Sequence, residues 1–436
     1  FPDVGSSQIL LTDRDGVAPT LTSNLIGGWA TTNGTEFASW TAPKGIGALN
    51  SAGYAGYTGT TIPTGSNPTQ NIRITATGAV GAADTINSLN MVGDINLTFA
   101  SATNTLNLVS GGLLKSGNTA NTIGATADSG RLTAGGTGTG IQELFIMNNQ
   151  NTLTVNSRII DNGSGGQTRL VIAGAGTTTL TAPNTYTGDT VINSAVNLSG
   201  GVGIVVIPNP GAAGGNTLTI NNAAVTMVTN NGQIGANNNL VLNGDADLTY
   251  VGANTVNGTI TFNHTGSAGT PTLTTGGTLT LNGNITSVND VFGTTPTIAG
   301  VLDIGSATRT VDASGLSLNN LVISAQILGA GGGALTKTGA GALSLTSATS
   351  TFNGGLNLNV GSLIIGGSDT VTAGVKTGGP LGLGTLSVAS GLKLIGTSAT
   401  NYNAVTLTSN NLFVCGVSSN GRDVRHCGPA QIPVDA

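Results

Sequence analysis

Short alternating runs of apolar and hydroxyl residues, each bounded by Gly or Asn, recur along the whole 436-residue chain. Leu, Val and Ile fall on every second position, which is the period of a half-buried β-strand, and the branched Thr side chain packs well on a pleated surface. Eight Asn-Gly pairs lie among these runs, and this pair is typical of tight turns because both residues tolerate positive φ angles. The clearest runs are Asn104–Val109, Asn151–Val155, Asn216–Ile220, Asn239–Asn243, Thr278–Asn282 and Ala342–Thr346. The pattern predicts an all-β fold built from many short strands.

A β-solenoid fits this pattern better than a sandwich, a barrel or a propeller. The strand motifs are so uniform that no special core positions stand out, and aromatic residues make up only 3% of the chain, too few to fill a thick sandwich core. A solenoid has a narrow interior of stacked Val, Leu, Ile and Ala, and each coil needs only its neighbours to bury that interior. We therefore predict a β-solenoid with coils of roughly 20–25 residues, along which Asn and Thr side chains form hydrogen-bonded ladders.

The charge of the chain excludes several classes of protein. Charged residues make up only 7% of the sequence, and the net charge is −5. No basic patch is present, so we predict no nucleic-acid partner. No run of about 18 apolar residues occurs, so we predict no membrane insertion of this chain. Helix-favouring Glu, Lys, Arg and Gln are too scarce to cover a solvated helical face.

Two units of the sequence, Gly174–Gly201 and Gly339–Gly367, follow one pattern. Each opens with Gly-Ala-Gly, continues with an alternating run, reaches an aromatic residue and a glycine turn, and closes on Gly-Gly after a second alternating run. The pattern resembles the autotransporter-associated β-strand repeat of bacterial surface proteins. In the first unit the matching residues are Gly174, Gly176, Leu180, Asn184, Tyr186, Gly188, Val191 and Leu198. In the second they are Leu335, Lys337, Gly339, Gly341, Leu343, Leu345, Phe352, Gly354, Gly361 and Leu363, with Phe in place of Tyr.

This resemblance implies a right-handed parallel β-helix that is secreted or exposed on a cell surface. The segment Ile26–Trp40 in addition resembles a segment of large repeat proteins of planctomycete and verrucomicrobial type. We divide the chain into an N-terminal strand and irregular cap at 1–60, a solenoid rod at 61–410, and a C-terminal tail at 411–436. The first residue is Phe1 and not Met, which we interpret as a processed N-terminus that fits export.

Cys415 and Cys427 are the only cysteines in the chain. One close pair in a chain of this composition predicts a disulfide loop in the C-terminal tail and an oxidising compartment. Two free thiols or two interchain links are the alternatives.

Side chains able to carry out chemistry are sparse. The only glutamates are Glu36 and Glu143, whereas β-helix enzymes that act on carbohydrates need clustered carboxylates with Arg or Lys. We therefore predict no enzymatic activity, no cofactor and no metal. Asp245 and Asp247 would share one face of a strand and could bind calcium, but we favour a turn followed by a solvated strand edge. His264 has no neighbouring ligand residues in the sequence, and we interpret it as a surface residue.

Predicted subunit contacts lie at the two ends of the chain. Short apolar strands at these ends could extend the sheet of a neighbouring molecule, or each could cap its own rod. Two arginines inside the cysteine loop could contact another subunit or a glycan, or remain solvated. The residues concerned are Ile9, Leu10, Leu11, Leu412, Phe413, Val414, Arg422 and Arg425.

Two functions are consistent with these features. We expect an extracellular structural protein that associates with copies of itself through its solenoid ends into a fibre, sheath or surface matrix. The alternative is a monomeric rod-like adhesin that binds a surface or a cell-surface polysaccharide, and a long insertion loop or an exposed aromatic row would favour it. Trp40, Tyr54 and Tyr57 form the only aromatic cluster, and they could stack on sugars or fill the N-terminal cap.

Overall fold

The computed structural model describes residues 20–42, 44–198, 217–227, 239–266, 269–389 and 392–396, and short pieces at 401, 403, 405–407, 413–416 and 428–429. Every regular element in these residues is a strand, as the sequence predicts. None of the described segments is a helix that could cross a membrane. The chain divides into two compact units: the first holds the described residues up to Leu218 together with 223–227, and the second holds 219–222 and the described residues from Asn239 onward.

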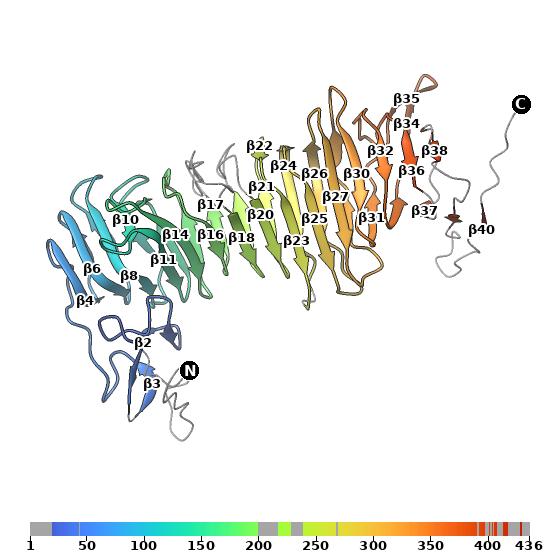
Figure 1. Ribbon diagram of the computed structural model, residues 1–436. Coiled ribbons are helices and arrows are strands. Elements are labelled where there is room, and N and C mark those ends of the chain that lie inside the picture. Colours follow the sequence, from blue (N-terminus) through green and yellow to red (C-terminus); the bar gives the residue numbers. More distant parts are fainter. Residues whose placement is uncertain are drawn as a thin grey trace, which may run out of the picture. The chain divides into compact units, whose positions relative to one another are not determined.

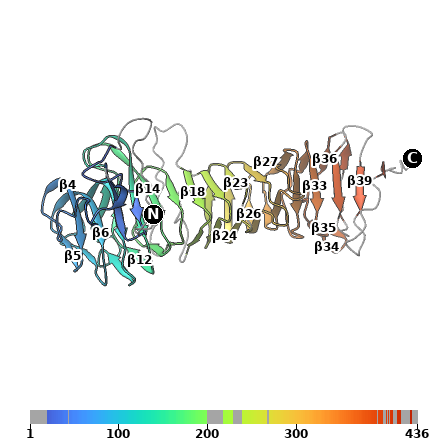
Figure 2. The same ribbon diagram turned by 90° about the horizontal axis from the view of Figure 1, so that it is seen from below.

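The first unit consists of two parallel sheets between which the chain alternates (Figures 1 and 2). The first sheet contains β4 (Ser66–Ile74), β6 (Ala83–Met91), β8 (Thr105–Lys115), β10 (Arg131–Ala134), β11 (Gly140–Asn148), β13 (Arg158–Ile159), β14 (Gly166–Ala173) and β16 (Thr190–Ile192). The second contains β5 (Gly78–Val80), β7 (Leu97–Phe99), β9 (Asn121–Ile123), β12 (Thr152–Val155), β15 (Thr177–Leu180), β17 (Val196–Leu198) and β19 (Ala224–Met227). Strand β18 (Thr217–Asn221) contributes its first two residues to this unit and the rest to the second.

The second unit repeats this arrangement. Its first sheet contains β20 (Asn239–Asn243), β23 (Ile260–His264), β25 (Ile285–Asn289), β27 (Thr308–Ser314), β30 (Ala334–Thr338), β32 (Leu356–Leu358), β36 (Leu386–Val388) and β38 (Val405–Leu407). Its second sheet contains β21 (Asp247–Tyr250), β22 (Asn254–Val256), β24 (Thr272–Leu281), β26 (Thr297–Asp303), β28 (Leu321–Ile323), β29 (Gln326–Leu328), β31 (Ala342–Leu345), β33 (Ser362–Ile365), β37 (Lys393–Gly396) and β39 (Phe413–Gly416). This unit also contains two short antiparallel pairings. One is the hairpin of β34 (Thr370–Thr372) and β35 (Val375–Gly378), and the other is β40 (Gly428–Pro429) beside β39.

The strand pairing confirms the β-solenoid. Neighbouring strands of a sheet are parallel and lie one coil apart in the sequence, so each coil contributes strands to both sheets. In a β-sandwich, by contrast, neighbouring strands of a sheet are usually antiparallel. Thr178 pairs with Val196 across a short coil, whereas Leu356 pairs with Leu386 across a longer coil that includes the β34–β35 hairpin. The coils therefore vary more in length than the sequence predicts. The arrangement is consistent with the right-handed parallel β-helix, the hand that parallel crossover connections almost always take.

Alternation of side chains within each strand produces the interior. In β14, buried and half-buried residues alternate without a break, and Leu170 and Ile172 point inward. Complete burial of such a side chain contributes about 1.5–3 kcal/mol. Tyr186 and Phe352, the aromatic residues of the two sequence units, are also completely buried. Their position in the repeat therefore fills the interior and does not present a ring to solvent.

Residues 20–58 form a layer on the outside of the first unit, which we call the N-terminal layer. It contains the antiparallel strands β1 (Thr31–Thr32), β2 (Glu36–Thr41) and β3 (Gly45–Ala48) (Figure 1). Its apolar residues Leu25, Phe37 and Leu49 pack with Leu114 of β8 and Met147 of β11. The described part of the predicted cap thus covers the flank of the first sheet.

Polar contacts attach the same layer to β4, β6 and β8. Asn71 Nδ2 donates to Ser23 O at 2.6 Å, and Asn90 Nδ2 donates to Thr35 O at 3.0 Å. Gly28 lies so close to β8 that a Cβ at this position would be 2.1 Å from Ser110 O. The layer therefore requires glycine at this point of contact.

Most of the predicted contacts at the chain ends lie outside the described residues. This is so for Ile9, Leu10, Leu11, Leu412, Arg422 and Arg425, and for Cys427 and hence the predicted disulfide with Cys415. The backbone of β39, which includes Phe413 and Val414, is described. It pairs with β37 on one side and with β40 on the other, both within this chain.

Candidate functional site

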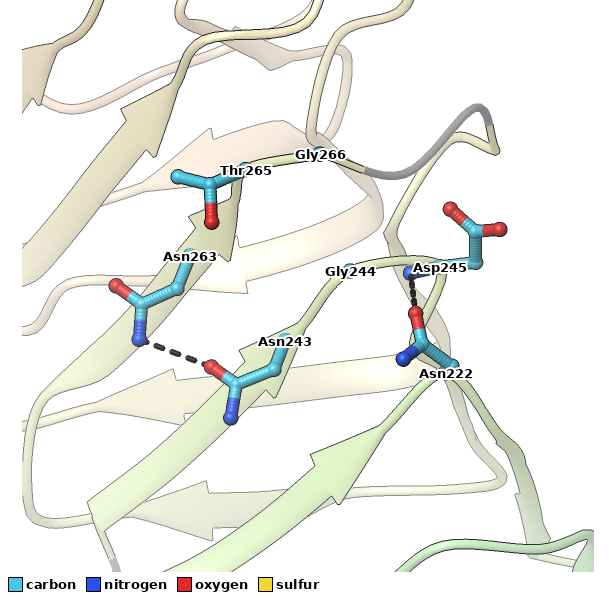
Figure 3. Close-up of a pocket in the computed structure, with 7 residues that line it drawn as sticks. All are labelled: Asn222, Asn243, Gly244, Asp245, Asn263, Thr265 and Gly266. Atoms are coloured by element: carbon cyan, nitrogen blue, oxygen red, sulfur yellow. Dashed lines mark hydrogen bonds between the residues drawn. The ribbon is translucent and has the colours of Figure 1, made fainter.

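A polar groove in the second unit is the candidate site. It is lined by Asn222, Asn243, Gly244, Asp245, Asn263, Thr265 and Gly266 (Figure 3). These residues lie where β18, β20 and β23 end and the chain passes from the first sheet to the second. The groove therefore follows the corner of three successive coils.

A ladder of asparagine side chains forms one wall of the groove. Asn243 and Asn263 are register partners on β20 and β23. Asn263 Nδ2 donates to Asn243 Oδ1 at 2.9 Å, and Asn243 Nδ2 donates to Asn221 Oδ1 at 2.7 Å. The ladder ends at β25, where Val288 is the partner of Asn263. The sequence prediction of asparagine ladders is confirmed here.

A tight turn forms the opposite wall. Gly244 has a φ of 62°, and a Cβ there would lie 2.0 Å from Asn222 Oδ1. The same oxygen accepts a hydrogen bond from Asp245 N at 3.0 Å, and Asp245 Oδ1 accepts one from Gly269 N at 2.8 Å. Asp245 thus belongs to the turn, and Asp247 is the first residue of β21. The favoured interpretation, a turn followed by a strand edge, is confirmed.

The charge of one carboxylate acts on the other. Partial burial, and to a smaller degree the charge of Asp245, raises the pKa of Asp247 above its usual range. Within the described part of the chain, no three His, Cys, Asp or Glu side chains gather where they could hold a metal ion. Calcium also prefers six to eight oxygen ligands, usually with several carboxylates.

His264 is completely buried, so its interpretation as a surface residue is wrong. On β23 the inward positions are Ile260, Phe262 and His264, and the period of two places the histidine inside. Its Nδ1 lies 3.0 Å from Asn289 Oδ1, which also accepts the amide of Val291. Nδ1 is therefore the protonated ring nitrogen that donates. The alternation in the sequence contained this signal.

Lys337 has a structural role that the sequence did not reveal. Its side chain is completely buried. The ammonium donates to Thr338 O at 2.5 Å, to Gly339 O at 2.7 Å and to Val360 O at 3.3 Å. Burial lowers the pKa of Lys337 to about 8, and the charge of Asp312 opposes this shift. The lysine satisfies the carbonyl groups of a corner in two adjacent coils.

Glu36, Arg73 and Tyr57 meet in the first unit, and such side chains could in principle serve carbohydrate chemistry. Tyr57 Oη donates to Glu36 Oε2 at 2.7 Å, and Arg73 Nε lies 3.4 Å from Glu36 Oε1. Burial, followed by the charge of Glu36, raises the pKa of Tyr57, so the phenol stays protonated. All three groups are occupied in holding the N-terminal layer to the solenoid.

The aromatic cluster belongs to the same layer. Tyr57 packs against its apolar residues, and Tyr54 Oη donates to Gly45 O at 3.2 Å. These two rings fill the N-terminal layer.

A hairpin insertion projects from the second unit. Strands β34 and β35 occupy the long coil between β33 and β36, and the turn between them contains Ala373 and Gly374 with φ angles of 50° and 81°. Val371 and Val375 are 43% and 65% exposed. Lys376 Nζ lies 2.9 Å from Asp369 Oδ2 and secures the base of the hairpin.

Four exposed apolar side chains of the second unit lie in the connections that follow β25, β27 and β32 of the first sheet. We call Phe292, Leu316, Leu318 and Val360 the apolar corner; the first three are 68%, 74% and 82% exposed. Leu316 N donates to Asp290 Oδ1 at 2.8 Å, so the turn after β27 stacks directly on the turn after β25. Large apolar patches on a protein surface are usually sites of interaction.

Comparison with known protein families identifies two segments. Residues 170–196 and 335–365 match the passenger-associated-transport-repeat. The first segment lies in β14–β17 and the second in β30–β33, so each match includes strands of two adjacent coils. No curated protein and no solved structure matches the chain.

Proposed function

We propose, with the two passenger-associated-transport repeats as the premise, that this chain is the passenger-type rod of an extracellular bacterial protein and acts as an adhesin for surface polysaccharide. The repeats are scaffold, because their Leu and aromatic side chains fill the interior of the coils to which they belong. Binding must then depend on what the scaffold displays.

The β34–β35 hairpin is the observation that carries this proposal. It interrupts a series of short coils with a projecting element whose residues 370–375 are all exposed. An insertion of this kind was expected of an adhesin and serves no purpose in a uniform rod. The proposal includes no catalytic role, which agrees with the structural use of Glu36, Arg73 and Tyr57.

Surface labelling and adhesion together test this function. Antibodies against the rod should label intact cells, and the purified chain should bind polysaccharide-coated beads. Replacement of the exposed residues 371–375 by Gly-Gly, which leaves the Lys376–Asp369 pair in place, should reduce bead binding at least about threefold while the unfolding temperature of the rest stays unchanged. Ala373→Gly, which keeps the hairpin and its left-handed turn, is the matched control. Exclusively intracellular labelling, or full adhesion without the hairpin, would contradict the proposal.

Self-association is the second candidate, and the apolar corner favours it. Three large side chains that are each more than 65% exposed lower the free energy when a second copy covers them. Association end to end at β39 would require β40 to leave, because β39 pairs on both sides within this chain. Side-by-side association through the apolar corner leaves the pairing of β39 with β40 intact.

Sedimentation of the purified chain tests this candidate. Oligomers of the original chain should dissociate in the double variant Leu316→Ser, Leu318→Ser. Val375→Ser, on the exposed hairpin, is the control. A monomer at all concentrations, or oligomers that the double variant leaves intact, would exclude association through this corner.

A further inference from the structure

We infer that Lys376 and Asn403 join in an intramolecular isopeptide bond, which forms spontaneously and closes the base of the hairpin covalently. Lys376 belongs to β35, and Asn403 lies 27 positions later, just before β38. A third residue, Asp369, lies just before β34 and assists the reaction. The bond joins side chains of this chain alone and does not depend on the proposed adhesin function.

The three side chains meet at one nitrogen atom. Lys376 Nζ donates to Asn403 Oδ1, and it also lies 2.9 Å from Asp369 Oδ2. The side chain of Lys376 is 13% exposed and that of Asp369 is 0% exposed. The amine and the carboxyl group therefore meet where little water reaches them, and a carboxamide lies against the amine.

These groups are sufficient for the exchange of one amide for another. Transfer of one proton from Lys376 Nζ to Asp369 Oδ2 produces the neutral amine that attacks, and burial reduces the cost of removing the two charges. A bond forms between Nζ and Asn403 Cγ, and the bond between Cγ and Nδ2 breaks. The two protons that Nζ loses pass through the carboxylate to the departing nitrogen, which leaves as an ammonium ion. Nothing is oxidised or reduced, and no co-reactant is needed.

Only side-chain rotation separates the observed contact from the reactive one. Asn403 Cγ is bonded to the Oδ1 atom that already accepts the hydrogen bond, at about 1.2 Å. The long stem of Lys376 is flexible enough to move Nζ from the oxygen to the carbon. A carboxylate has about four lone-pair sites, so Asp369 can take the proton and keep its other contacts. Holding the reacting groups together in this way accelerates their reaction.

The nitrogen that leaves is surrounded by acceptors. Asn403 Nδ2 donates to Gly384 O at 2.6 Å. It also donates to Leu381 O and to Gly382 O, each at 3.3 Å. A primary amide nitrogen has only two hydrogens for these three carbonyl groups. When the nitrogen is protonated to leave, it gains a further hydrogen and a positive charge, and the carbonyl groups stabilise both.

The preceding coil holds these carbonyl groups in place. Leu383 N donates to Phe352 O at 2.8 Å, and Gly379 N donates to Ser350 O at 3.0 Å. Phe352 is completely buried, so the loop 379–384 rests on the interior of the rod. The acceptors are therefore fixed before the reaction, as electrostatic stabilisation of a transition state requires.

The bond protects the rod where the hairpin is inserted. Strands β34 and β35 form a two-stranded pairing, which has little stability of its own. A covalent link from the base of this hairpin to the segment before β38 keeps the base closed when the strands separate. Like a disulfide, the link restricts the unfolded chain. Unlike a disulfide, it is insensitive to reducing agents.

Intact-mass spectrometry of the full chain, after reduction of any disulfide, provides the test. We expect a mass about 17 Da below that of the sequence, which corresponds to the loss of one ammonia. Proteolysis should then release a branched peptide that contains both Lys376 and Asn403. Lys376→Arg keeps the positive charge and the donors but cannot attack, so this variant should have the full mass. Asn403→Ala should have the full mass as well.

Two further variants complete the test. Asp369→Asn keeps the size of the side chain and removes the proton carrier, so most of this variant should have the full mass. Lys393→Arg, at an exposed position on β37, is the matched control and should still lose about 17 Da. A succinimide formed at an Asn-Gly pair also loses one ammonia, but it gives no branched peptide and persists in Lys376→Arg.

Two results would overturn the isopeptide bond. One is an original chain that is folded by circular dichroism and has the full mass. The other is a loss of mass that Lys376→Arg leaves unchanged. If a variant does not fold, the branched peptide of the original chain decides the matter, since its presence or absence does not depend on any variant.

Discussion

Lys337 offers the sharpest test of how the solenoid is held together. Lys337→Met keeps the length of the side chain and removes the ammonium that donates to four carbonyl groups, those of Ala313, Thr338, Gly339 and Val360. An unsatisfied buried acceptor costs about 1–3 kcal/mol. Removing the buried charge recovers part of this loss. We expect the variant to be less stable at pH 7 by about 1–3 kcal/mol.

The pH dependence of this difference follows from the lowered pKa. Lys337 has a pKa of about 8 in the folded protein and 10.5 in the unfolded chain. Between these values the unfolded state binds more protons, so the free energy of unfolding of the original protein rises with pH, by at most about 3 kcal/mol. Lys337→Met cannot titrate here, so the stability advantage of the original protein should grow from pH 8 to pH 10.

Urea unfolding followed by circular dichroism at pH 7, 8, 9 and 10 measures this difference. Tyrosines with raised pKa values, such as Tyr186, lower stability above pH 10 in both proteins and cancel in the comparison. Lys393→Met, at an exposed position on β37, is the control for the loss of a lysine side chain. A difference between the original protein and Lys337→Met that stays constant from pH 7 to pH 10 would refute the assigned role of burial.

Two further substitutions test the packing. Gly28→Ala should displace the N-terminal layer, because the added Cβ would lie 2.1 Å from Ser110 O. We expect the free energy of unfolding to fall by about 2 kcal/mol and residues 20–58 to be cleaved faster by a protease. Gly81→Ala is the control: a Cβ at Gly81 meets open space, so neither quantity should change. Tyr186→Phe should cost about 1–2 kcal/mol in thermal unfolding, since it leaves Thr190 Oγ1 buried without its partner at 2.6 Å. Adding Thr190→Val should restore part of that stability, and a double variant no more stable than Tyr186→Phe would show that the two hydroxyls are not coupled.

The sequence by itself determined the local structure and the class of fold. Apolar residues at every second position specify which face of a strand is buried, and this depends only on neighbours in the chain. The same rule places Leu170, Ile172 and even His264 inside, although the histidine was not interpreted in this way. Asn-Gly pairs such as Asn243–Gly244 mark turns because of their backbone freedom, and Gly244 does adopt a positive φ.

Only the tertiary structure decided which residues meet. Successive coils differ in length, so the stacking partner of a residue cannot be read from a constant period: a short coil separates Thr178 from Val196, and a much longer one separates Leu356 from Leu386. The ladder from Asn243 to Asn263 and the carbonyls around Lys337 depend on this register. The N-terminal layer docks through contacts between segments far apart in the chain, such as Asn71 with Ser23, for which no local pattern exists. The alternation of buried and exposed residues is a property of one strand, whereas a groove is a property of several strands in register. The energy that fixes this register comes from packing between coils.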